Sequence, residues 1–221
     1  MSTGFFISFE GVEGCGKSTQ IRILRDRLKS ENMPVRLTRE PGDGEMGGRI
    51  RELLLSVSSA LDPLTELFLL AADRTRHVTE IVRPGLAAGD VVLSDRYADS
   101  SVAYQGYGRE LPLDFVHLIN SRATGGLVPD LTFLMDIDPE ISLRRSRIRL
   151  HQQNMFEAEG RFETECLAFH RRVREGYLRI ARDEPGRYAV LDGTLPVENL
   201  SETIAAIAIG ALAQRKEMET V

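Results

Sequence analysis

The stretch Gly11-Val12-Glu13-Gly14-Cys15-Gly16-Lys17-Ser18 decides the fold of this chain of 221 residues. Its spacing matches GxxxxGK[ST], a motif in which glycines let the backbone N–H groups wrap a phosphate. The apolar run Phe5–Phe9 precedes it as a predicted buried strand, and Lys17–Lys29 follows with an apolar stripe at helical spacing. A strand, a glycine loop and a helix N-terminus in this order predict a site for a nucleoside triphosphate with Mg²⁺. The residues expected to bind that nucleotide are Gly11, Val12, Glu13, Gly14, Cys15, Gly16, Lys17, Ser18 and Thr19.

Outward from this loop, short apolar runs typical of strands alternate with longer patterns of helical spacing. The predicted strands are Phe5–Phe9, Val35–Thr38, Val91–Ser94, Leu131–Ile137 and Tyr188–Leu191. The predicted helices are Lys17–Lys29, Pro63–Ala88, Glu163–Asp183 and Pro196–Ala213. Repeated β–α units have right-handed crossovers, so the pattern predicts an α/β fold of the P-loop NTPase type, with a parallel five-stranded sheet and helices on both faces. Since the sequence has no internal repeat or linker, we expect residues 1–221 to form one domain.

One segment departs from this alternation. Residues 144–160 are polar, carry several arginines and glutamines, and have no clear periodicity near Gln152–Asn154. Such a composition is typical of an exposed connection rather than of a buried element. We expect this segment to form a mobile lid at the surface.

The composition limits the classes of partner. The formal net charge of −5 disfavours general binding to nucleic acid or to an anionic membrane, because both require a basic surface. The basic residues are nearly all arginine, whose planar fork suits phosphate, and the lysines are Lys17, Lys29 and Lys216. Cys15 and Cys166 form no CxxC pair, and no apolar run approaches the roughly 20 residues of a membrane span. We therefore expect a cytoplasmic protein.

A second group of polar residues follows the predicted strand Val91–Ser94. Asp95 comes directly after it and supplies a carboxylate suited to hold Mg²⁺ through a water. Arg96 then places a guanidinium at the carboxyl edge of the sheet, where ligands of α/β proteins bind. The residues that follow include Ser100, Tyr104 and Gln105, whose hydroxyl, phenol and amide groups suit hydrogen bonding to a nucleobase and a sugar.

Several motifs together resemble those of the thymidylate kinases (dTMP kinases), nearly end to end. They are FEGVEGCGKST (9–19), TREPG (38–42), AADRTRH (71–77), RPGLAAGDVVLSDRY (83–97), SSVAYQG (100–106), PDLTFLMDIDPE (129–140) and VREGYL (173–178). DRY followed by AYQG is specific to that family, whereas the phosphate loop alone is not. The resemblance implies transfer of the ATP γ-phosphate to dTMP, giving ADP and dTDP for dTTP synthesis, by a homodimer.

Matching positions carry roles over from the family. The resemblance implies that Lys17 and Ser18 hold the ATP phosphates and Mg²⁺, with Asp95 near the metal. Glu13 resembles the family's acidic residue close to the sugar 3′-hydroxyl and the acceptor phosphate. The residues implied to bind dTMP, through its phosphate, sugar or base, are Arg39, Leu70, Arg74, Arg96, Ser100, Tyr104 and Gln105.

The loop also indicates which type of family member this is. Some members place a catalytic arginine at the fourth loop position, which is Gly14 here. Arg145, Arg147 and Arg149 resemble the alternating lid arginines of bacterial members that lack the loop arginine. An arginine closing from a lid can stabilise the charge of a phosphoryl transition state, so we expect Arg147→Ala to lose most of kcat. The implied catalytic residues are Lys17, Glu13, Arg96, Arg145, Arg147 and Arg149.

The sequence departs from the family pattern in three places. Leu70 stands where the family has a phenylalanine that stacks on thymine, and Phe68 is two residues, or about 200° of helix, away. The loop after Arg39 reads REPGDG rather than REPGGT, and the lid is longer and ends in Gly160-Arg161-Phe162-Glu163 rather than DRxE.

Two alternatives to a dTMP kinase remain open. One is a kinase for another (deoxy)nucleoside monophosphate such as dUMP, which the change at Leu70 motivates. The other is a nucleotide-binding regulator without catalysis, which the intact Lys17, Asp95 and lid arginines disfavour.

Overall fold

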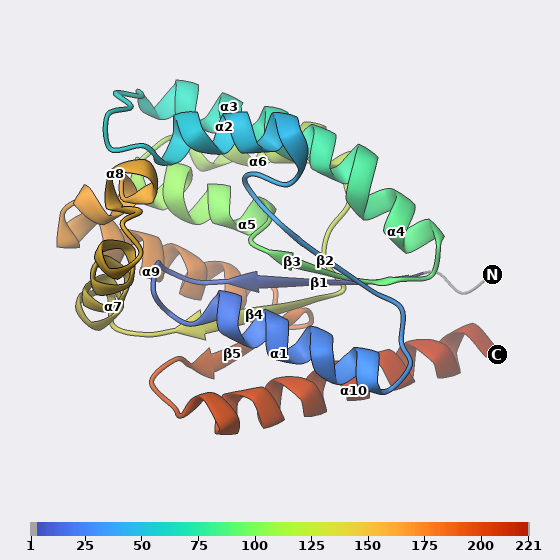
Figure 1. The fold of residues 1–221 in the computed structure, drawn as a ribbon. Coiled ribbons are helices and arrows are strands. Elements are labelled where there is room, and N and C mark those ends of the chain that lie inside the picture. The colour runs from blue at the N-terminus through green and yellow to red at the C-terminus, as the bar shows by residue number, and fades with distance from the viewer. Residues whose placement is uncertain (1–3, 221) are drawn as a thin grey trace.

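A parallel sheet forms the centre of the computed structural model, which describes residues 4–220 (Figure 1). Within this range the strand order is β2-β3-β1-β4-β5. The strands are β1 (Phe5–Glu10), β2 (Val35–Arg39), β3 (Val91–Asp95), β4 (Leu131–Asp136) and β5 (Tyr188–Asp192). All pairings are parallel, so the carboxyl ends of the strands share one edge of the sheet.

The central strand β1 explains why the sheet forms around it. All six of its residues are buried, since β3 pairs on one side, β4 on the other, and helices cover both faces. A continuous apolar run such as FFISF is typical of a parallel strand covered in this way. The register places Phe9 opposite Asp95, and Arg39 of β2 opposite the same aspartate. Residues that directly follow β1, β2 and β3 are thereby brought to a common edge.

Helices cover both faces of the sheet. The helices α1 and α10 pack side by side on one face, while α3 to α6 and α9 lie over the other (Figure 1). The helices α7 and α8 lie beyond the carboxyl ends of the strands. Their bounds are α1 (Lys17–Ser30), α2 (Gly44–Leu55), α3 (Pro63–His77), α4 (Arg83–Ala87), α5 (Ala98–Ser101), α6 (Leu113–Thr124), α7 (Pro139–Gln152), α8 (Phe156–Glu159), α9 (Leu167–Asp183) and α10 (Val197–Thr220), with π-helical turns η1 (Val78–Val82) and η2 (Val102–Gly108) and a 3₁₀ turn η3 (Phe162–Thr164).

The predicted α/β architecture is confirmed, with each predicted strand found within one residue of its expected ends. The expected helix Pro63–Ala88 divides into α3, η1 and α4. Pro84 has no N–H for the helical ladder, and the widened turn η1 comes directly before the segment that holds it. The helices α2 and α6 were not predicted.

The segment expected to form a lid, residues 144–160, is largely helical rather than irregular. Its first part, up to Gln152, continues α7, which buries Leu143, Ser146 and Leu150 at helical spacing. Only a short turn over 153–155 then separates α7 from α8. No helix within residues 4–220 is long and apolar enough to cross a membrane.

Candidate active site

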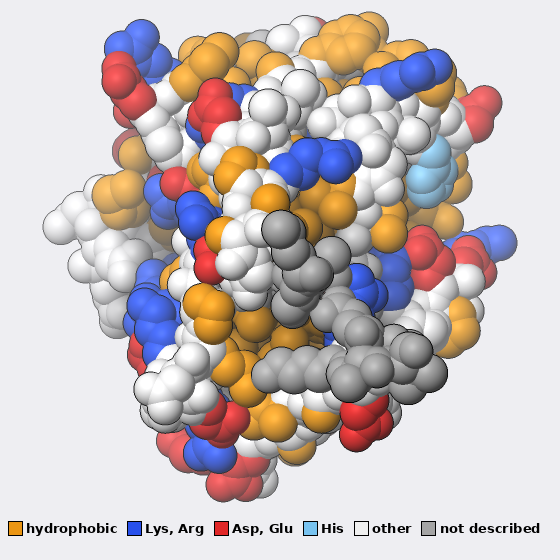
Figure 2. Space-filling view, turned by 90° about the vertical axis from the view of Figure 1, so that its right-hand side faces the viewer, with side chains coloured by type: hydrophobic (Ala, Val, Ile, Leu, Met, Phe, Trp, Pro, Cys, Tyr) orange, Lys and Arg blue, Asp and Glu red, His pale blue; other side chains and the backbone are white. Residues whose placement is uncertain are grey.

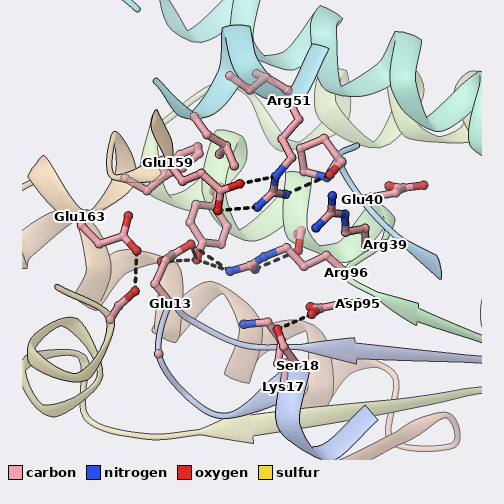
Figure 3. Close-up of a pocket in the computed structure, with 18 of the residues that line it drawn as sticks. Glu13, Lys17, Ser18, Arg39, Glu40, Arg51, Asp95, Arg96, Glu159 and Glu163 are labelled. Atoms are coloured by element: carbon pink, nitrogen blue, oxygen red, sulfur yellow. Dashed lines mark hydrogen bonds and ion pairs between the residues drawn. The ribbon is translucent and has the colours of Figure 1, made fainter. Parts of the chain in front are cut away.

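A cavity of about 670 Å³ opens at the carboxyl ends of the strands. It is lined from the phosphate loop, the ends of β2 and β3, the helices α2, α3 and α7, and η2. Figure 3 shows Lys17 and Ser18 at one end, Arg51 and Glu159 at the other, and Arg96 between them. The predicted residues that line the cavity are Glu13, Gly14, Gly16, Lys17, Ser18, Thr19, Arg39, Leu70, Arg74, Asp95, Arg96, Ser100, Tyr104, Gln105, Arg145 and Arg149.

The phosphate loop has the backbone that its glycines predict. Gly11, Gly14 and Gly16 have φ angles of 134°, 73° and 103°, in the left-handed region that favours glycine. The Lys17 ammonium donates to the carbonyl oxygens of Gly11 and Val12, at 2.9 Å each. The loop therefore holds the lysine beside the backbone that would surround a phosphate.

Three predicted loop residues do not line the cavity. Val12 and Cys15 are buried in the main hydrophobic core, and Gly11 approaches the Met135 carbonyl of β4 so closely that a Cβ would lie 2.7 Å from it. The side chain of Val12 serves packing, and the Cys15 sulfur packs in the core while accepting a 3.4 Å hydrogen bond from the Lys17 ammonium. These three residues can therefore meet a nucleotide through their backbone groups.

Gly14 is the point where α7 approaches the loop. A Cβ at Gly14 would collide with the carbonyl oxygen of Ser142 and lie 3.0 Å from the amide of Ser146. This backbone contact leaves no room for a side chain at the fourth loop position. The helix that carries Arg145 and Arg149 is seated where a loop arginine would otherwise project.

Ser18 and Asp95 form an oxygen pair beside Lys17. The Ser18 hydroxyl donates a 2.6 Å hydrogen bond to Oδ2 of Asp95 (Figure 3). A hydroxyl and a carboxylate are oxygen ligands of the kind that Mg²⁺ accepts, usually completed by waters and phosphate oxygens. Within residues 4–220 no cluster of three or more His, Cys, Asp or Glu side chains offers an all-protein metal site. The chemistry of this pair fits a magnesium ion shared with phosphate.

Arg96 joins the loop to the second half of the site. Its backbone has a φ of 73°, and its guanidinium donates to the Gly11 carbonyl at 3.0 Å and to Oε1 of Glu13 at 2.9 Å. The Tyr104 hydroxyl lies 2.6 Å from both oxygens of Glu13, and Arg96 lies over the Tyr104 ring. A carboxylate, a guanidinium and a phenol, each predicted separately, thus form one hydrogen-bonded network.

Two carboxyl groups near Arg96 have opposite pKa shifts. Burial alone raises the pKa of Glu13, but Arg96, His170 and Lys17 outweigh it and hold that pKa below its ordinary value. Burial, with the charge of Asp99, raises the pKa of Glu10 to about 7. Glu13 is therefore ionised at neutral pH, whereas Glu10 lies near the midpoint of its titration.

Of the residues predicted to bind the nucleotide that accepts the phosphoryl group, some are exposed and others are buried. Arg39 is exposed at the end of β2, and its guanidinium forms no hydrogen bond or ion pair with another side chain among residues 4–220. Arg74 is 1% exposed, and its guanidinium already bonds Glu40, Ser101, Asn120 and the carbonyl of Tyr97. Arg39 thus has its donors available to a ligand, while Arg74 chiefly holds the wall of the cavity.

The base-stacking position contains no aromatic ring. Leu70 lines the cavity and packs in a cluster with Leu54 and Phe162. Phe68 lies outside the cavity, is 47% exposed, and packs edge-on against Phe115 at 6.4 Å between ring centres. Helix geometry therefore keeps Phe68 from replacing the missing ring, as the sequence predicted.

The lid arginines do not share one face. Arg145 and Arg149 line the cavity, four residues apart on α7. Arg147, 200° around the helix from each, does not line it and donates to the backbone carbonyl of Glu163. The structure thus brings two of the three predicted arginines to the site.

Several residues of the site were not predicted. Arg51 of α2 makes a two-bonded ion pair with Glu159 of α8, at 3.0 and 3.1 Å, which joins the lid segment to α2 (Figure 3). Glu163 accepts from Ser146, and burial together with the charge of Glu13 raises its pKa. Glu10 does not line the cavity, but it accepts a hydrogen bond from Ser100, which does. Its place directly after the predicted strand, at the carboxyl edge of the sheet, could have marked it; Arg51 had no such signal, because its helix was not predicted.

Comparison with known proteins agrees with this geometry. The family model described as Thymidylate kinase matches residues 9–204. A thymidylate kinase of Desulfovibrio desulfuricans is 50% identical over 196 residues, which cover 88% of this chain and 90% of the relative. One of Nitratidesulfovibrio vulgaris is 48% identical over 217 residues, covering 98% and 97%. The crystal structure of thymidylate kinase from Ehrlichia chaffeensis superposes with a TM-score of 0.72 at 30% identity, covering 95% of this chain and 99% of that one. With a phosphate loop facing Arg96 and Tyr104 across one cavity, and with these relatives matched over nearly their full length, the chain belongs to the thymidylate kinase family.

Proposed function

We propose that this protein transfers the γ-phosphoryl group of ATP to dTMP, giving ADP and dTDP, with Mg²⁺ as cofactor. The observation that carries this proposal is that one cavity contains both the phosphate loop and the hydrogen-bonding groups of Arg96, Tyr104 and Gln105. A kinase needs donor and acceptor in line within such a space, and water excluded from it.

On the donor side, Lys17 and the loop amides bind the β- and γ-phosphates. Lys17 gives up its bonds to the loop carbonyls when phosphate oxygens replace them. Ser18 and Asp95 would hold Mg²⁺, which would supply positive charge opposite the phosphates. Arg145 and Arg149 add positive charge from α7.

On the acceptor side, Arg39 and Arg96 bind the dTMP phosphate. Glu13 is ionised and already accepts hydrogen bonds from Arg96 and Tyr104, so it holds both groups in position beside the sugar. Gln105 and Ser100 face the nucleoside. Leu70 packs against the base without stacking a ring on it.

We also propose that the protein acts in the cytoplasm and that two copies of the chain form a homodimer. The thiols of Cys15 and Cys166 are both free, which suits a reducing compartment. Leu64 and Phe68 of α3 and Leu118 of α6 are half-exposed. Figure 2 shows hydrophobic side chains along the upper edge of the molecule, where α2, α3 and α6 lie in Figure 1. We assign the apolar face of α3 and α6, defined by Leu64, Phe68 and Leu118, to contact with a second copy of the chain.

The test is an ADP-release assay with dTMP, dUMP, dCMP, dGMP and AMP as acceptors. We expect the highest kcat/KM with dTMP. The second candidate, a kinase for another monophosphate, rests on Leu70 and predicts the highest kcat/KM with dUMP or a further nucleotide. ADP release that no acceptor stimulates would contradict both.

A further inference from the structure

The carboxylate of Glu66 lies behind the cavity wall and contacts a group that lines it. Glu66 belongs to α3 and is fully buried. Its Oε1 accepts a 2.7 Å hydrogen bond from Nε2 of Gln105, a residue of η2 that is 1% exposed and lines the cavity. Glu66 itself does not line it.

Two arginines fix the position of this carboxylate. Arg161, after α8, donates to Oε2 at 2.6 Å, and Arg109, after η2, donates to Oε2 at 3.2 Å and to Oε1 at 3.3 Å. Both oxygens of Glu66 are therefore occupied by donors from separate segments. The carboxylate has little freedom to turn away from Gln105.

The carboxylate leaves Gln105 only one favourable amide orientation. A side-chain amide has a donor NH₂ and an acceptor oxygen, whereas an ionised carboxylate only accepts. Turning the amide over would set Oε1 of Gln105 against Oε1 of Glu66, two acceptors in contact. In the observed orientation Oε1 of Gln105 is buried and has no hydrogen-bond partner among the described residues. It is an acceptor held ready for a donor that the chain does not supply.

Pyrimidine bases differ in what they offer such an acceptor. Thymine and uracil carry an N–H at ring position 3, whereas cytosine carries a bare nitrogen, itself an acceptor. We propose that Glu66 is a positioning residue for base choice: by accepting from Nε2 of the cavity-lining Gln105, it leaves Oε1 as the unpaired acceptor, which favours bases with an N3–H and disfavours cytosine. This inference rests on the proposed function, because it takes a pyrimidine monophosphate as the acceptor.

The apolar surroundings make a mismatch costly. Leu54, Leu70 and Phe162 pack in one cluster that lines the same cavity. A site built to hydrogen-bond one partner rejects an analogue that leaves its buried groups unpaired, by factors that reach 10⁴ or more. The orientation of one amide is therefore enough to separate dTMP from dCMP.

Glu66→Gln tests this directly. The new amide can donate to Oε1 of Gln105 or accept from its Nε2, so neither orientation is repelled. We expect the ratio of kcat/KM for dTMP to that for dCMP to fall at least about tenfold, mainly through a higher KM for dTMP. The KM for ATP should stay within about threefold of the wild type. An unchanged dTMP to dCMP ratio would overturn the proposal.

Two further variants separate orientation from loosened packing. Arg109→Gln removes one cation from Glu66 but leaves its bond to Gln105, so the ratio should stay within about threefold; a fall equal to that in Glu66→Gln overturns the proposal. The double variant Glu66→Gln/Gln105→Glu again presents only acceptor oxygens to the base and preserves the total charge. It should restore the preference for dTMP, and it keeps the test decisive if Glu66→Gln does not fold. Failure to restore that preference overturns the proposal.

Measuring the wild type with dTMP, dUMP and dCMP distinguishes a failure of this inference from a failure of the proposed function. If the wild type phosphorylates neither dTMP nor dUMP, the proposed function fails, and this inference, which rests on it, fails with it. If the wild type prefers dTMP over dCMP while Glu66→Gln keeps the same ratio, only the role of Glu66 fails.

Discussion

Ser18 and Asp95 are 77 positions apart in the sequence, yet the serine hydroxyl donates a 2.6 Å hydrogen bond to the aspartate. The parallel pairing of β1 with β3 produces this contact, because the loop after one strand and the last residue of the other meet at the same edge. The pair is the chain's candidate for holding magnesium.

The first prediction concerns that metal. Asp95→Asn removes the negative charge of the pair, so we expect kcat to fall roughly 100-fold and half-maximal activity to require more Mg²⁺. A magnesium titration of activity measures this. Asp90→Asn is the matched control, since Asp90 lies at the opposite end of the sheet, paired with Arg36. Equal magnesium dependence in both variants would remove Asp95 from the metal site.

The lid arginines give a second prediction, which revises the one made from sequence. Arg145→Ala and Arg149→Ala should each lower kcat roughly 100- to 1,000-fold, because both guanidinium groups line the cavity. Arg147→Ala should lose less than about tenfold, since Arg147 does not line the cavity and its guanidinium is bonded to the Glu163 carbonyl. Single-turnover kinetics at saturating dTMP will rank the three. The greatest loss at Arg147 would mean that α7 turns during catalysis.

Leu70→Phe should strengthen dTMP binding. An aromatic ring at this position adds a stacking surface worth on the order of 1 kcal/mol, or about fivefold in KM. The KM for dTMP measures the change. Ile23→Phe, on the outer side of α1, adds the same ring away from the cavity and should leave KM unchanged. A higher KM in Leu70→Phe would show that the cluster with Phe162 has no room for the ring.

Glu10 makes stability depend on pH. Its pKa is about 7 in the folded chain and about 4.5 when unfolded, so the folded state binds more protons between these values. The free energy of unfolding should therefore fall as pH rises from 4.5 to 7, by on the order of 3 kcal/mol from this group. Denaturant unfolding of the wild type and Glu10→Gln at pH 5 and pH 8 isolates that contribution. Relative to the wild type, Glu10→Gln should have a higher free energy of unfolding at pH 8 than at pH 5. An equal difference between the two proteins at both pH values would contradict the raised pKa.

The apolar face of α3 and α6 gives a prediction about assembly. Phe68→Asp places a charge on it and should convert a dimer to a monomer in sedimentation equilibrium. Ile23→Asp adds the same charge on the opposite side of the sheet and should remain a dimer. A wild-type chain that sediments as a monomer would exclude the proposed homodimer.

The sequence was most informative where one local pattern determined the structure. The run Phe5–Phe9 predicted a buried strand, which is present, and the loop glycines predicted a backbone able to wrap a phosphate; Gly11, Gly14 and Gly16 have positive φ angles in the structure. Helix α2 was missed because Gly44, Gly47 and Gly48 disfavour a helix locally, while its stability comes from burying Ile50 and Leu54 against neighbouring elements.

Contacts between segments that are distant in the chain could not be predicted from the sequence. Nothing near Gln105 indicates that Glu66, 39 residues earlier, accepts its amide hydrogen. The spacing of Arg145, Arg147 and Arg149 suggested one set, and only a helical assignment of that segment separates the middle residue from the other two. Where a role depends on which side of a helix a residue faces, the secondary structure has to be known first.

The close approach of Gly14 to the backbone of Ser142 restricts how this protein could evolve. A change to arginine at position 14 would introduce a positive charge into the loop, but the new side chain would displace α7 and the arginines that it carries. Moving this positive charge from the helix to the loop therefore requires α7 to shift away from the loop at the same time. A chain with neither arginine source in position would have less positive charge at the cavity, so the two changes would have to occur together.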